Sequence, residues 1–365
     1  MEKVILWLRD EVKAFEYRSA LSPKSAEILI QKGVQVVVEK SMVRIFDDQL
    51  YADVGCQLVE AGSWKTQAPK EAYILGLKEL EEQSTPLKHK HIYFAHAYKN
   101  QTGSDKLLQR FKRGGGELLD LEYLVSEKGK RVAAFGYWAG FVGAAVGLEI
   151  LLKQFLSQDL KKYQLTSYKT KEHFLEHLKG LLKQVEAKKI PVSSIKTLVI
   201  GADGRCGTGA TDLLKSVNLQ PSLWGQKETK GRGLFTEILE HDLLLNCVFI
   251  KSRIPPFLNE DFLNQQSSGY KLKVISDVSC DPTGPYNPLP LYSKESTFQK
   301  PIHFLPYTNA NLYLTAVDHL PSVLPKESSS DFSSQLLGPL ASFLAGEDKG
   351  GVFARASKRF KEKTC

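Results

Sequence analysis

The sequence has little cysteine, and none of it lies in a pattern with a known structural role. Its five cysteines are an odd number and include no Cys-x-x-Cys pair, which argues against a disulfide framework or a zinc site and fits a reducing compartment. We also expect no signal peptide, and the sequence has no basic stretch interleaved with aromatic residues. We therefore expect no metal and no nucleic-acid partner, and we interpret the net charge of +8 as a solvated surface with cations for acidic small molecules.

One uncharged stretch, 132–148, is slightly shorter than the ~20 apolar residues that a bilayer core requires, and Glu149 ends it. Its glycines and alanines allow close approach of a neighbouring helix or strand in a soluble interface as well as in lipid. The stretch therefore predicts a buried helix over 135–155, and we expect no membrane partner.

Residues 197–210 read TLVIGADGRCGTGA, an apolar strand that leads through a glycine-rich turn into a helix. Gly204 allows the backbone to approach a pyrophosphate, Gly207 allows the helix to pack closely on the strand, and the helix N-terminus presents N–H groups to negative charge. The pattern G-x-G-x-x-G would place its first glycine at position 202. This chain has Ala202 there and a glycine one residue earlier, Gly201. The turn predicts a dinucleotide site; the alternative is a glycine-rich turn without a ligand.

Length and composition, with 42% hydrophobic and 25% charged residues, predict two domains. The fold class that we predict is α/β, with two Rossmann-like doubly wound domains flanking an interdomain cleft. The domains are 1–134 plus 325–365, which binds substrate, and 135–324, which binds NAD. Apolar runs predict strands and helical periodicity predicts helices: strands at 4–8, 34–39, 73–77, 91–95, 117–121, 196–201, 222–224, 243–248 and 273–278, and helices at 23–33, 104–113, 135–155, within 157–190 and within 328–365.

Ionisable residues of the first domain gather where its predicted strands end, which is where parallel sheets bind ligands. They are Arg18, Lys78, Glu79, His96, Lys99 and Glu122. Each one singly is compatible with a solvated side chain, and His96 with a core histidine. Together their cations predict a polyanionic ligand.

From end to end, the chain resembles the fungal saccharopine dehydrogenases that form L-lysine. The resemblance rests on residues 17–23, 61–66, 76–79, 94–99, 131–141, the glycine turn and 318–322. It implies an NAD-dependent oxidoreductase of lysine biosynthesis that oxidises the secondary amine of saccharopine and hydrolyses the imine to L-lysine and 2-oxoglutarate.

The resemblance also implies roles for individual residues. Lys78 is the base for the substrate amine, His96 serves acid–base catalysis of imine hydrolysis, and Glu79 and Glu122 tune their pKa values. The residues implied to bind substrate are Arg18, Lys99, Arg131, Phe135, Ser279, Cys280 and Asp281. Those implied to bind the cofactor are Gly204, Arg205, Gly207, Thr229, Val278, Val317, Asp318, His319 and Leu320.

Two positions depart from the family. Gly225 stands where the family has a carboxylate for the ribose hydroxyls, and Asp203 stands in the phosphate loop where the family has an apolar residue. We expect weak NAD binding from this, and tighter binding in Gly225→Asp. Two alternatives stay open: a homologue that lost NAD turnover and acts as a binding or regulatory protein, and an alanine-type amino-acid dehydrogenase.

Two further expectations concern thiols and location. Cys206 follows the first strand of the second domain and Cys247 its fourth; the strand order 3-2-1-4 would make these strands neighbours, so the thiols could bridge or could stay reduced side by side. Family members often end in a peroxisomal tripeptide, and Lys-Thr-Cys is not one. We therefore expect a cytoplasmic protein, and we expect it to be a monomer.

Overall fold

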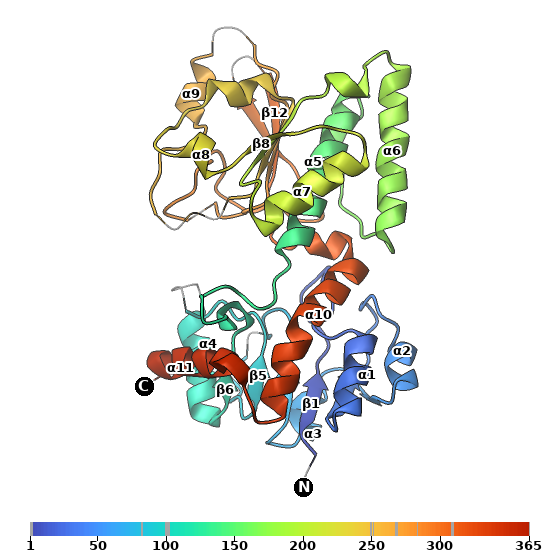
Figure 1. The fold of residues 1–365 in the computed structure, drawn as a ribbon, viewed down its shortest axis with the longest axis vertical. Helices are drawn as coiled ribbons and strands as arrows, with labels where there is room; N and C mark the ends of the chain where they lie inside the picture. The colour runs from blue at the N-terminus through green and yellow to red at the C-terminus, as the bar shows by residue number, and fades with distance from the viewer. Residues whose placement is uncertain are drawn as a thin grey trace. The chain divides into compact units, whose positions relative to one another are not determined.

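The computed structural model describes residues 3–81, 83–98, 103–248, 250, 252–266, 269–282, 284–307 and 310–364 (Figure 1). The chain forms two compact units. Unit 1 comprises Met1–Ala134 and Pro325–Cys365, and unit 2 comprises Phe135–Leu324. Each unit is a largely parallel sheet with helices, which confirms the predicted α/β, doubly wound fold class.

The sheet of unit 1 has the order β3-β2-β1-β4-β5-β6, and all its pairings are parallel. This is the strand order of a complete doubly wound sheet. Its short strand β3 follows no clear alternation of apolar residues and was not predicted. The strands are β1 Ile5–Leu8, β2 Gln35–Glu39, β3 Gln57–Val59, β4 Tyr73–Leu75, β5 Lys90–Ile92 and β6 Glu117–Leu118.

The helices of unit 1 bury both faces of its sheet. Helix α1 begins as predicted, because the Ser22 side chain accepts a hydrogen bond from Ser25 N and Pro23 occupies the first turn. Phe111 and Phe360 pack in the same apolar cluster as Trp7 of the sheet. The elements are α1 Pro23–Gln31, α2 Asp48–Asp53, α3 Trp64–Gln67, α4 Ser104–Gly114, η1 Leu121–Tyr123, α10 Pro325–Leu344, η6 Lys349–Gly351 and α11 Val352–Thr364.

The sheet of unit 2 has the order β11-β12-β10-β9-β7-β8. All its pairings are parallel except β11 with β12, a hairpin that was not predicted. The proline-rich sequence before it indicated a loop, but Pro306 is accommodated because β11 is an edge strand. The strands are β7 Thr197–Ile200, β8 Ser222–Trp224, β9 Leu243–Asn246, β10 Val274–Asp277, β11 His303–Tyr307 and β12 Ala310–Thr315.

Helix α5 (Gly136–Phe155) is the apolar core helix of unit 2. It is long and apolar enough to cross a membrane by length and composition, and 72% of that stretch is buried. Its glycines allow contact, since a Cβ on Gly140 would lie 1.8 Å from the Cys206 carbonyl oxygen. The other elements are η2 Leu160–Lys162, α6 Lys171–Ala187, η3 Val192–Ser194, α7 Arg205–Ser216, α8 Gln226–Thr229, η4 Thr236–Glu240, α9 Glu260–Asn264 and η5 Leu320–Val323.

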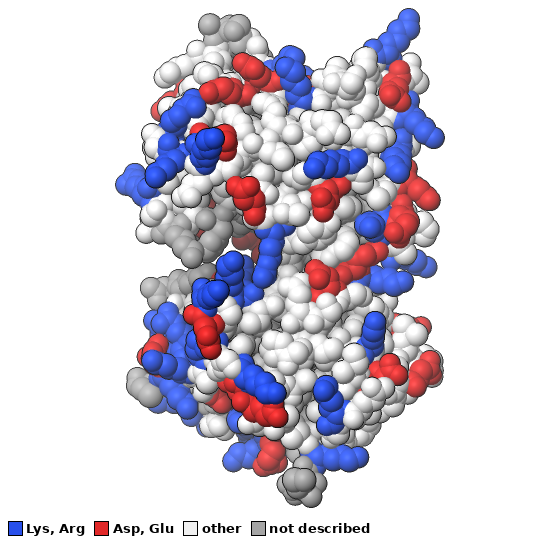
Figure 2. Space-filling view, viewed as in Figure 1, with Lys and Arg blue, Asp and Glu red and all other residues white. Residues whose placement is uncertain are grey.

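The surface charge is mixed. On the face drawn in Figure 2, Lys and Arg are interspersed with Asp and Glu over both units and do not form one continuous stripe. This is the distribution that we expect from lysines spread along the whole sequence.

Candidate functional site

In unit 1, a buried ion pair holds the turn that carries Lys78. The Glu11 carboxylate accepts hydrogen bonds from Leu77 N at 2.6 Å and Lys78 N at 2.9 Å. Arg9 lies 3.3 Å from Glu11 and also donates to the Lys78 carbonyl. Burial raises the pKa of Glu11 although Arg9 opposes the shift. Sequence analysis missed Arg9 and Glu11, which fix the backbone of the candidate base.

His96 follows β5 in a strained backbone conformation. Its φ is +51°, a left-handed value that is uncommon outside glycine and often found at functional sites. Its Nδ1 lies 3.9 Å from Glu122 Oε2, close enough for electrostatic influence but too long for a hydrogen bond. The structure thus brings these two predicted residues together.

Glu79 is oriented toward a different cation from the one expected. Its side chain is 47% exposed, and its Oε2 lies 3.9 Å from Lys13 Nζ. Lys13 was not singled out in the sequence, because it precedes the family-like stretch 17–23 and no motif marks it. Its position makes it a further cation at this edge of unit 1.

Arg18 is held by a carboxylate that sequence analysis also missed. Its Nε and Nη2 donate to the two oxygens of Glu16 at 2.7 and 2.5 Å, and both side chains are buried. The loop is anchored to α10, because Ser329 Oγ accepts a hydrogen bond from Ser19 N at 2.9 Å. Arg18 is therefore pre-positioned rather than mobile.

The remaining substrate residues predicted in unit 1 are described only in part. Arg131 is exposed and pairs with Val125 in an isolated antiparallel bridge. Lys99 lies outside the described residues.

In unit 2, the glycine turn has the geometry of a dinucleotide cradle. Gly201 has φ +85°, and a Cβ there would lie 2.8 Å from the Cys247 carbonyl oxygen. A Cβ on Gly207 would lie 2.2 Å from the Gly201 carbonyl oxygen, so both positions require glycine. Gly204 is the N-cap of α7, and within the described ranges no side chain caps it. The first-turn N–H groups of α7 therefore suit a pyrophosphate, and the residues present fit a dinucleotide. Arg205 is exposed at the first position of this helix.

Loops at the carboxyl ends of β9 and β10 join the glycine turn at the same sheet edge. Ser279 Oγ donates to the Val248 carbonyl at 2.7 Å, and Val278 would lie 2.5 Å from a Cβ on Gly143. Cys280 has φ +48° and its Sγ donates to the Ala316 carbonyl at 3.2 Å. Burial raises the pKa of the Cys280 thiol.

The last predicted stretch of the cofactor site lies beside these loops. Val317 is buried and pairs with Ser296 in a parallel bridge, and Leu320 lies 3.3 Å from the Cβ position of Gly143. His319 stacks on Phe298 with ring centroids 4.7 Å apart. Asp281 and Asp318 are both exposed, and Phe135 is half-buried as the N-cap of α5.

Cys206 and Cys247 lie together, as free thiols in the described part of the chain. A hydrogen bond to Cys206, with burial, raises the pKa of the Cys247 thiol well above its usual range. Cys247 follows β9, the third strand of unit 2 and not the fourth as expected, yet β9 does pair with β7. The disulfide bridge stays a prediction. Free thiols counted in wild type and Cys247→Ser, before and after mild oxidation, test it. An equal loss of free thiols in both proteins would contradict it.

The end of β8 is crowded by carboxylates that come from elsewhere. A Cβ on Gly225 would lie 2.4 Å from Asp203 Oδ2 and 3.6 Å from Glu228 Oε2. Glu228 Oε2 accepts a hydrogen bond from Gly225 N at 2.7 Å, and Thr229 Oγ1 donates to the Gly225 carbonyl at 3.1 Å. The gain of affinity expected from Gly225→Asp stays a prediction, and an aspartate at this position would require the exposed Asp203 side chain to turn away.

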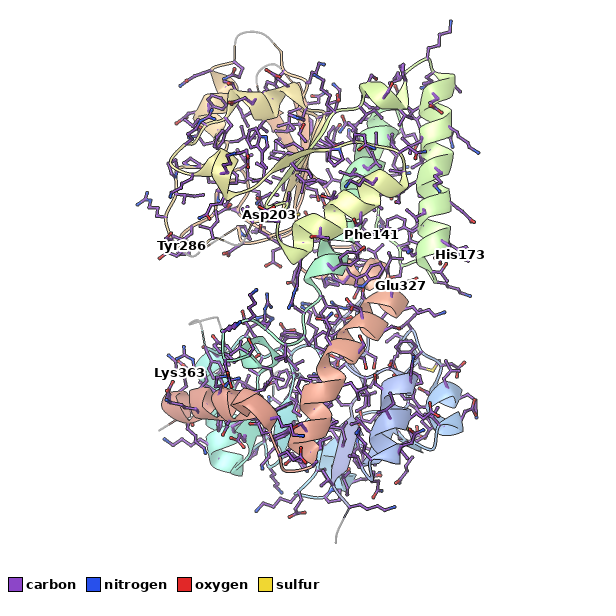
Figure 3. All side chains as sticks on the ribbon, in the orientation of Figure 1. Phe141, His173, Asp203, Tyr286, Glu327 and Lys363 are labelled. Carbon is purple, nitrogen blue, oxygen red and sulfur yellow. The ribbon has the colours of Figure 1, made fainter. Side chains whose placement is uncertain are left out.

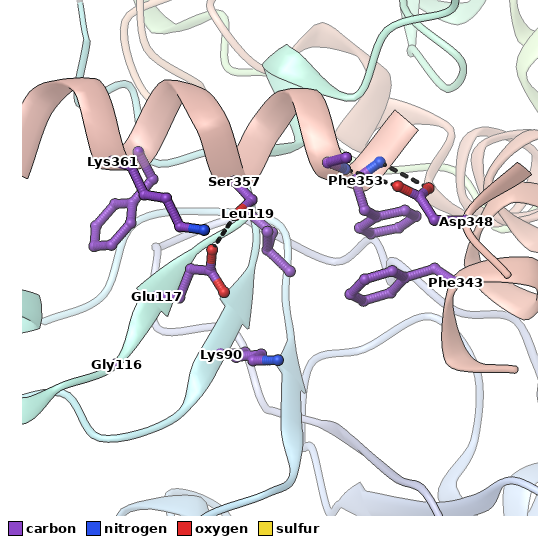
Figure 4. Close-up of a pocket in the computed structure, with 11 residues that line it drawn as sticks. Lys90, Gly116, Glu117, Leu119, Phe343, Asp348, Phe353, Ser357 and Lys361 are labelled. Carbon is purple, nitrogen blue, oxygen red and sulfur yellow. Dashed lines mark hydrogen bonds between the residues drawn. The ribbon is translucent and has the colours of Figure 1, made fainter. Parts of the chain in front are cut away.

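A separate cavity of about 470 Å³ lies in unit 1 under α11 (Figure 4). It is lined by Lys90 and Glu117, which begin β5 and β6, and by the stacked rings of Phe343 and Phe353. Because strands β5 and β6 start here, this cavity lies at the sheet edge opposite to the candidate site. We do not assign it to the site.

Two doubly wound units, one with a dinucleotide turn and one with a lysine and a histidine at its carboxyl edge, define a Rossmann-like dehydrogenase of two units. The fold is similar to an L-alanine dehydrogenase, with TM-score 0.68 and 16% identity over 98% of this chain and 94% of that one. It is also similar to a transhydrogenase from Sinorhizobium meliloti, with TM-score 0.60 and 15% identity over 92% and 91%. The alanine dehydrogenase/PNT N-terminal domain family matches residues 7–142.

Closer relatives define the family more narrowly. The chain is 44% identical to the saccharopine dehydrogenase [NAD(+), L-lysine-forming] of Yarrowia lipolytica over 98% of this chain and 96% of that protein. It is 44% identical to the enzyme of that name from Emericella nidulans, over 99% and 97%, and 42% identical to that of Schizosaccharomyces pombe, over 97% and 97%. The chain belongs to the family of L-lysine-forming saccharopine dehydrogenases.

Proposed function

We propose that the chain catalyses the NAD-dependent oxidation of saccharopine to L-lysine and 2-oxoglutarate in the α-aminoadipate route of lysine biosynthesis. The observation that carries this proposal is the 44% identity, over 98% of the chain, to a relative named for that activity. The similarity spans both units, so it includes the glycine turn and the lysine–histidine edge.

Unit 2 binds the cofactor in this proposal. The pyrophosphate lies at the N-terminus of α7, whose N–H groups and helix dipole favour negative charge. When it is bound, NAD⁺ supplies the group that accepts hydride from the carbon attached to the substrate amine. The loops around Val278 and Leu320 line the same sheet edge and complete the cofactor site with Thr229, Val317, Asp318 and His319.

Unit 1 binds the substrate and moves its protons. Saccharopine has three carboxylates, for which we propose Arg18, Lys99 and Arg131 as partners. Lys78 takes a proton from the secondary amine, because a carbon next to a protonated amine cannot release hydride. The Glu11–Arg9 pair supports this step by fixing the backbone of Lys78.

His96 then serves the hydrolysis of the imine. It takes a proton from water as the water oxygen bonds to the imine carbon, and it passes this proton to the nitrogen. As the carbon–nitrogen bond breaks, His96 takes the remaining hydroxyl proton and the carbonyl forms. L-lysine leaves with the nitrogen and 2-oxoglutarate with the new carbonyl oxygen. Phe135 and residues 279–281 are further proposed substrate contacts, and Glu122 influences His96 from 3.9 Å.

The test is the absorbance of reduced nicotinamide when purified protein receives NAD⁺ and saccharopine, with L-lysine measured in the same mixture. We expect equal amounts of reduced cofactor and L-lysine. Reduction with L-alanine instead would support the alanine-type alternative. Binding of NAD⁺ and saccharopine with no reduction would support the binding or regulatory alternative.

We also propose that the enzyme acts on small molecules as a monomer in the cytoplasm. Support comes from Cys56, Cys206, Cys247 and Cys280, which are free thiols as in a reducing compartment. Sedimentation of the purified chain tests the monomer, and imaging of the tagged protein tests the location.

A further inference from the structure

Rossmann sites that bind NAD usually place an acidic residue at the end of the second strand, where its carboxylate binds the ribose 2′-hydroxyl. In unit 2 that strand is β8, which ends at Trp224. The next residue is Gly225, which has no side chain. If unit 2 binds NAD, as proposed above, another group must provide this hydrogen bond or the site lacks it.

Asp203 extends its carboxylate to this position from the glycine turn. Its Oδ2 lies 2.4 Å from the point where a Cβ on Gly225 would stand. In an aspartate, the Cβ and a carboxylate oxygen are separated by about 2.4 Å, because one carbon joins them at ordinary bond lengths and angles. The Asp203 oxygen is thus as far from this Cβ position as the oxygen of an aspartate at 225 would be.

We propose that Asp203 replaces the missing strand-end carboxylate, binds the ribose hydroxyls of NAD and selects NAD over NADP. The exchange needs both positions: Gly225 leaves the space, and Asp203 fills it. This inference rests on the proposed function, because it concerns the cofactor site of unit 2.

The local charges are consistent with this arrangement. Asp203 directly precedes Gly204, the N-cap of α7, and the partial positive charge of a helix N-terminus stabilises a carboxylate there (Figure 3). Because the carboxylate is directed toward Gly225, it need not repel a pyrophosphate at the helix axis. The Glu228 carboxylate is held nearby by its hydrogen bond from Gly225 N. A 2′-phosphate at this position would meet two carboxylates, which disfavours NADP.

Variants that exchange the residues at these two positions test the proposal. Their binding is measured by calorimetric titration with NAD⁺, NADP⁺ and ADP-ribose, which has the ribose but no nicotinamide. In Asp203→Ala and Asp203→Asn, the dissociation constants of NAD⁺ and ADP-ribose should rise by about tenfold or more, because each variant loses a hydrogen bond to a charged acceptor. The same variants should narrow the preference for NAD⁺ over NADP⁺. Gly225→Asp alone should also weaken NAD⁺ binding, because the new side chain would crowd the Asp203 carboxylate.

The double variant Asp203→Ala/Gly225→Asp should recover most of the NAD⁺ affinity, since it returns the carboxylate to the strand end. Glu186→Ala on α6 removes an exposed carboxylate elsewhere in unit 2 and should change nothing. Unchanged affinity in both Asp203 variants, or tighter NAD⁺ binding in Gly225→Asp, would overturn the inference. A wild type that binds neither NAD⁺ nor ADP-ribose would instead overturn the proposed function, and this inference with it.

Discussion

The two units use the same part of a Rossmann-like fold in opposite ways. In unit 1 the loop after the first strand, 9–22, contains no glycine and carries charged side chains. In unit 2 the turn after the first strand is short and rich in glycine, and its backbone is exposed at the start of α7. One loop can present side chains to a charged substrate, and the other can present backbone N–H groups to a pyrophosphate.

The residues at the ends of the second strands also differ between the units: here unit 1 has a carboxylate and unit 2 has a glycine. Unit 1 has Glu39 at the end of β2, where a ribose carboxylate would be expected. It is buried, and it accepts hydrogen bonds from Trp7 Nε1 at 3.1 Å, Asp10 N at 2.9 Å, Gly62 N at 2.9 Å and Trp64 N at 2.7 Å. Unit 2 has only Gly225 there. Topological position alone therefore does not identify a ribose site, and the donors around a carboxylate decide its role.

The largest expected effect tests the chemistry assigned to unit 1. Lys78→Met or His96→Gln should lower turnover of saccharopine by ~10²- to 10⁴-fold, because each removes an acid–base group. Lys65→Met is the matched control, since that exposed lysine of unit 1 pairs with Glu81 at the surface. Steady-state rates at the pH optimum measure this effect. Rate losses below about tenfold in both variants would show that Lys78 and His96 are not the acid–base groups of the reaction.

A smaller effect tests the glycine turn of unit 2. Gly207→Ala should lower the free energy of unfolding by roughly 1–3 kcal/mol, because its Cβ would collide with a backbone carbonyl oxygen 2.2 Å away. It should also weaken NAD⁺ binding. Gly180→Ala in α6 is the control, since no described atom beyond its chain neighbours and the nearby backbone of its own helix lies within 4 Å of its Cβ position, and it should raise stability by about 0.4–1 kcal/mol.

Denaturant unfolding measures both glycine variants. Equal stability of Gly207→Ala and wild type would mean that α7 can move away from the turn, which would contradict the close packing described for unit 2.

The smallest effect is a pH dependence of unit 1. Burial raises the pKa of Glu11 in the folded state, so the folded protein binds this proton more tightly than the unfolded chain. The stability that protonated Glu11 contributes is present below its unfolded pKa of about 4.3 and is lost as pH rises through the higher folded pKa. The unfolding free energy of wild type, relative to Glu11→Gln, should therefore fall as the pH rises above the unfolded pKa of Glu11. A relative stability that rises over this range would contradict the sign of the shift.

Much of the fold could be predicted from the sequence, because apolar runs with clear turn or cap residues give local information. The cap at Ser22 and the apolar core helix α5 are examples. The hairpin β11–β12 could not be predicted, since Pro306 is compatible with a strand only at a sheet edge, and edge position depends on tertiary structure.

The candidate site was predictable where a motif or a strand end marked it. The proximity of His96 and Glu122 is an example. The Arg9–Glu11 and Glu16–Arg18 pairs were missed because the loop 9–22 has no periodic pattern. The approach of Asp203 to Gly225 was missed because it depends on the direction of one side chain.

The measurement that tests the division of roles between the units most directly is the dissociation constant of NAD⁺, without substrate, for His96→Gln beside that for wild type. The account predicts equal constants, with turnover lost in the variant, because cofactor binding belongs to unit 2 and proton transfer to unit 1. A tenfold or larger weakening of NAD⁺ binding in His96→Gln, in a variant that is folded, would contradict it.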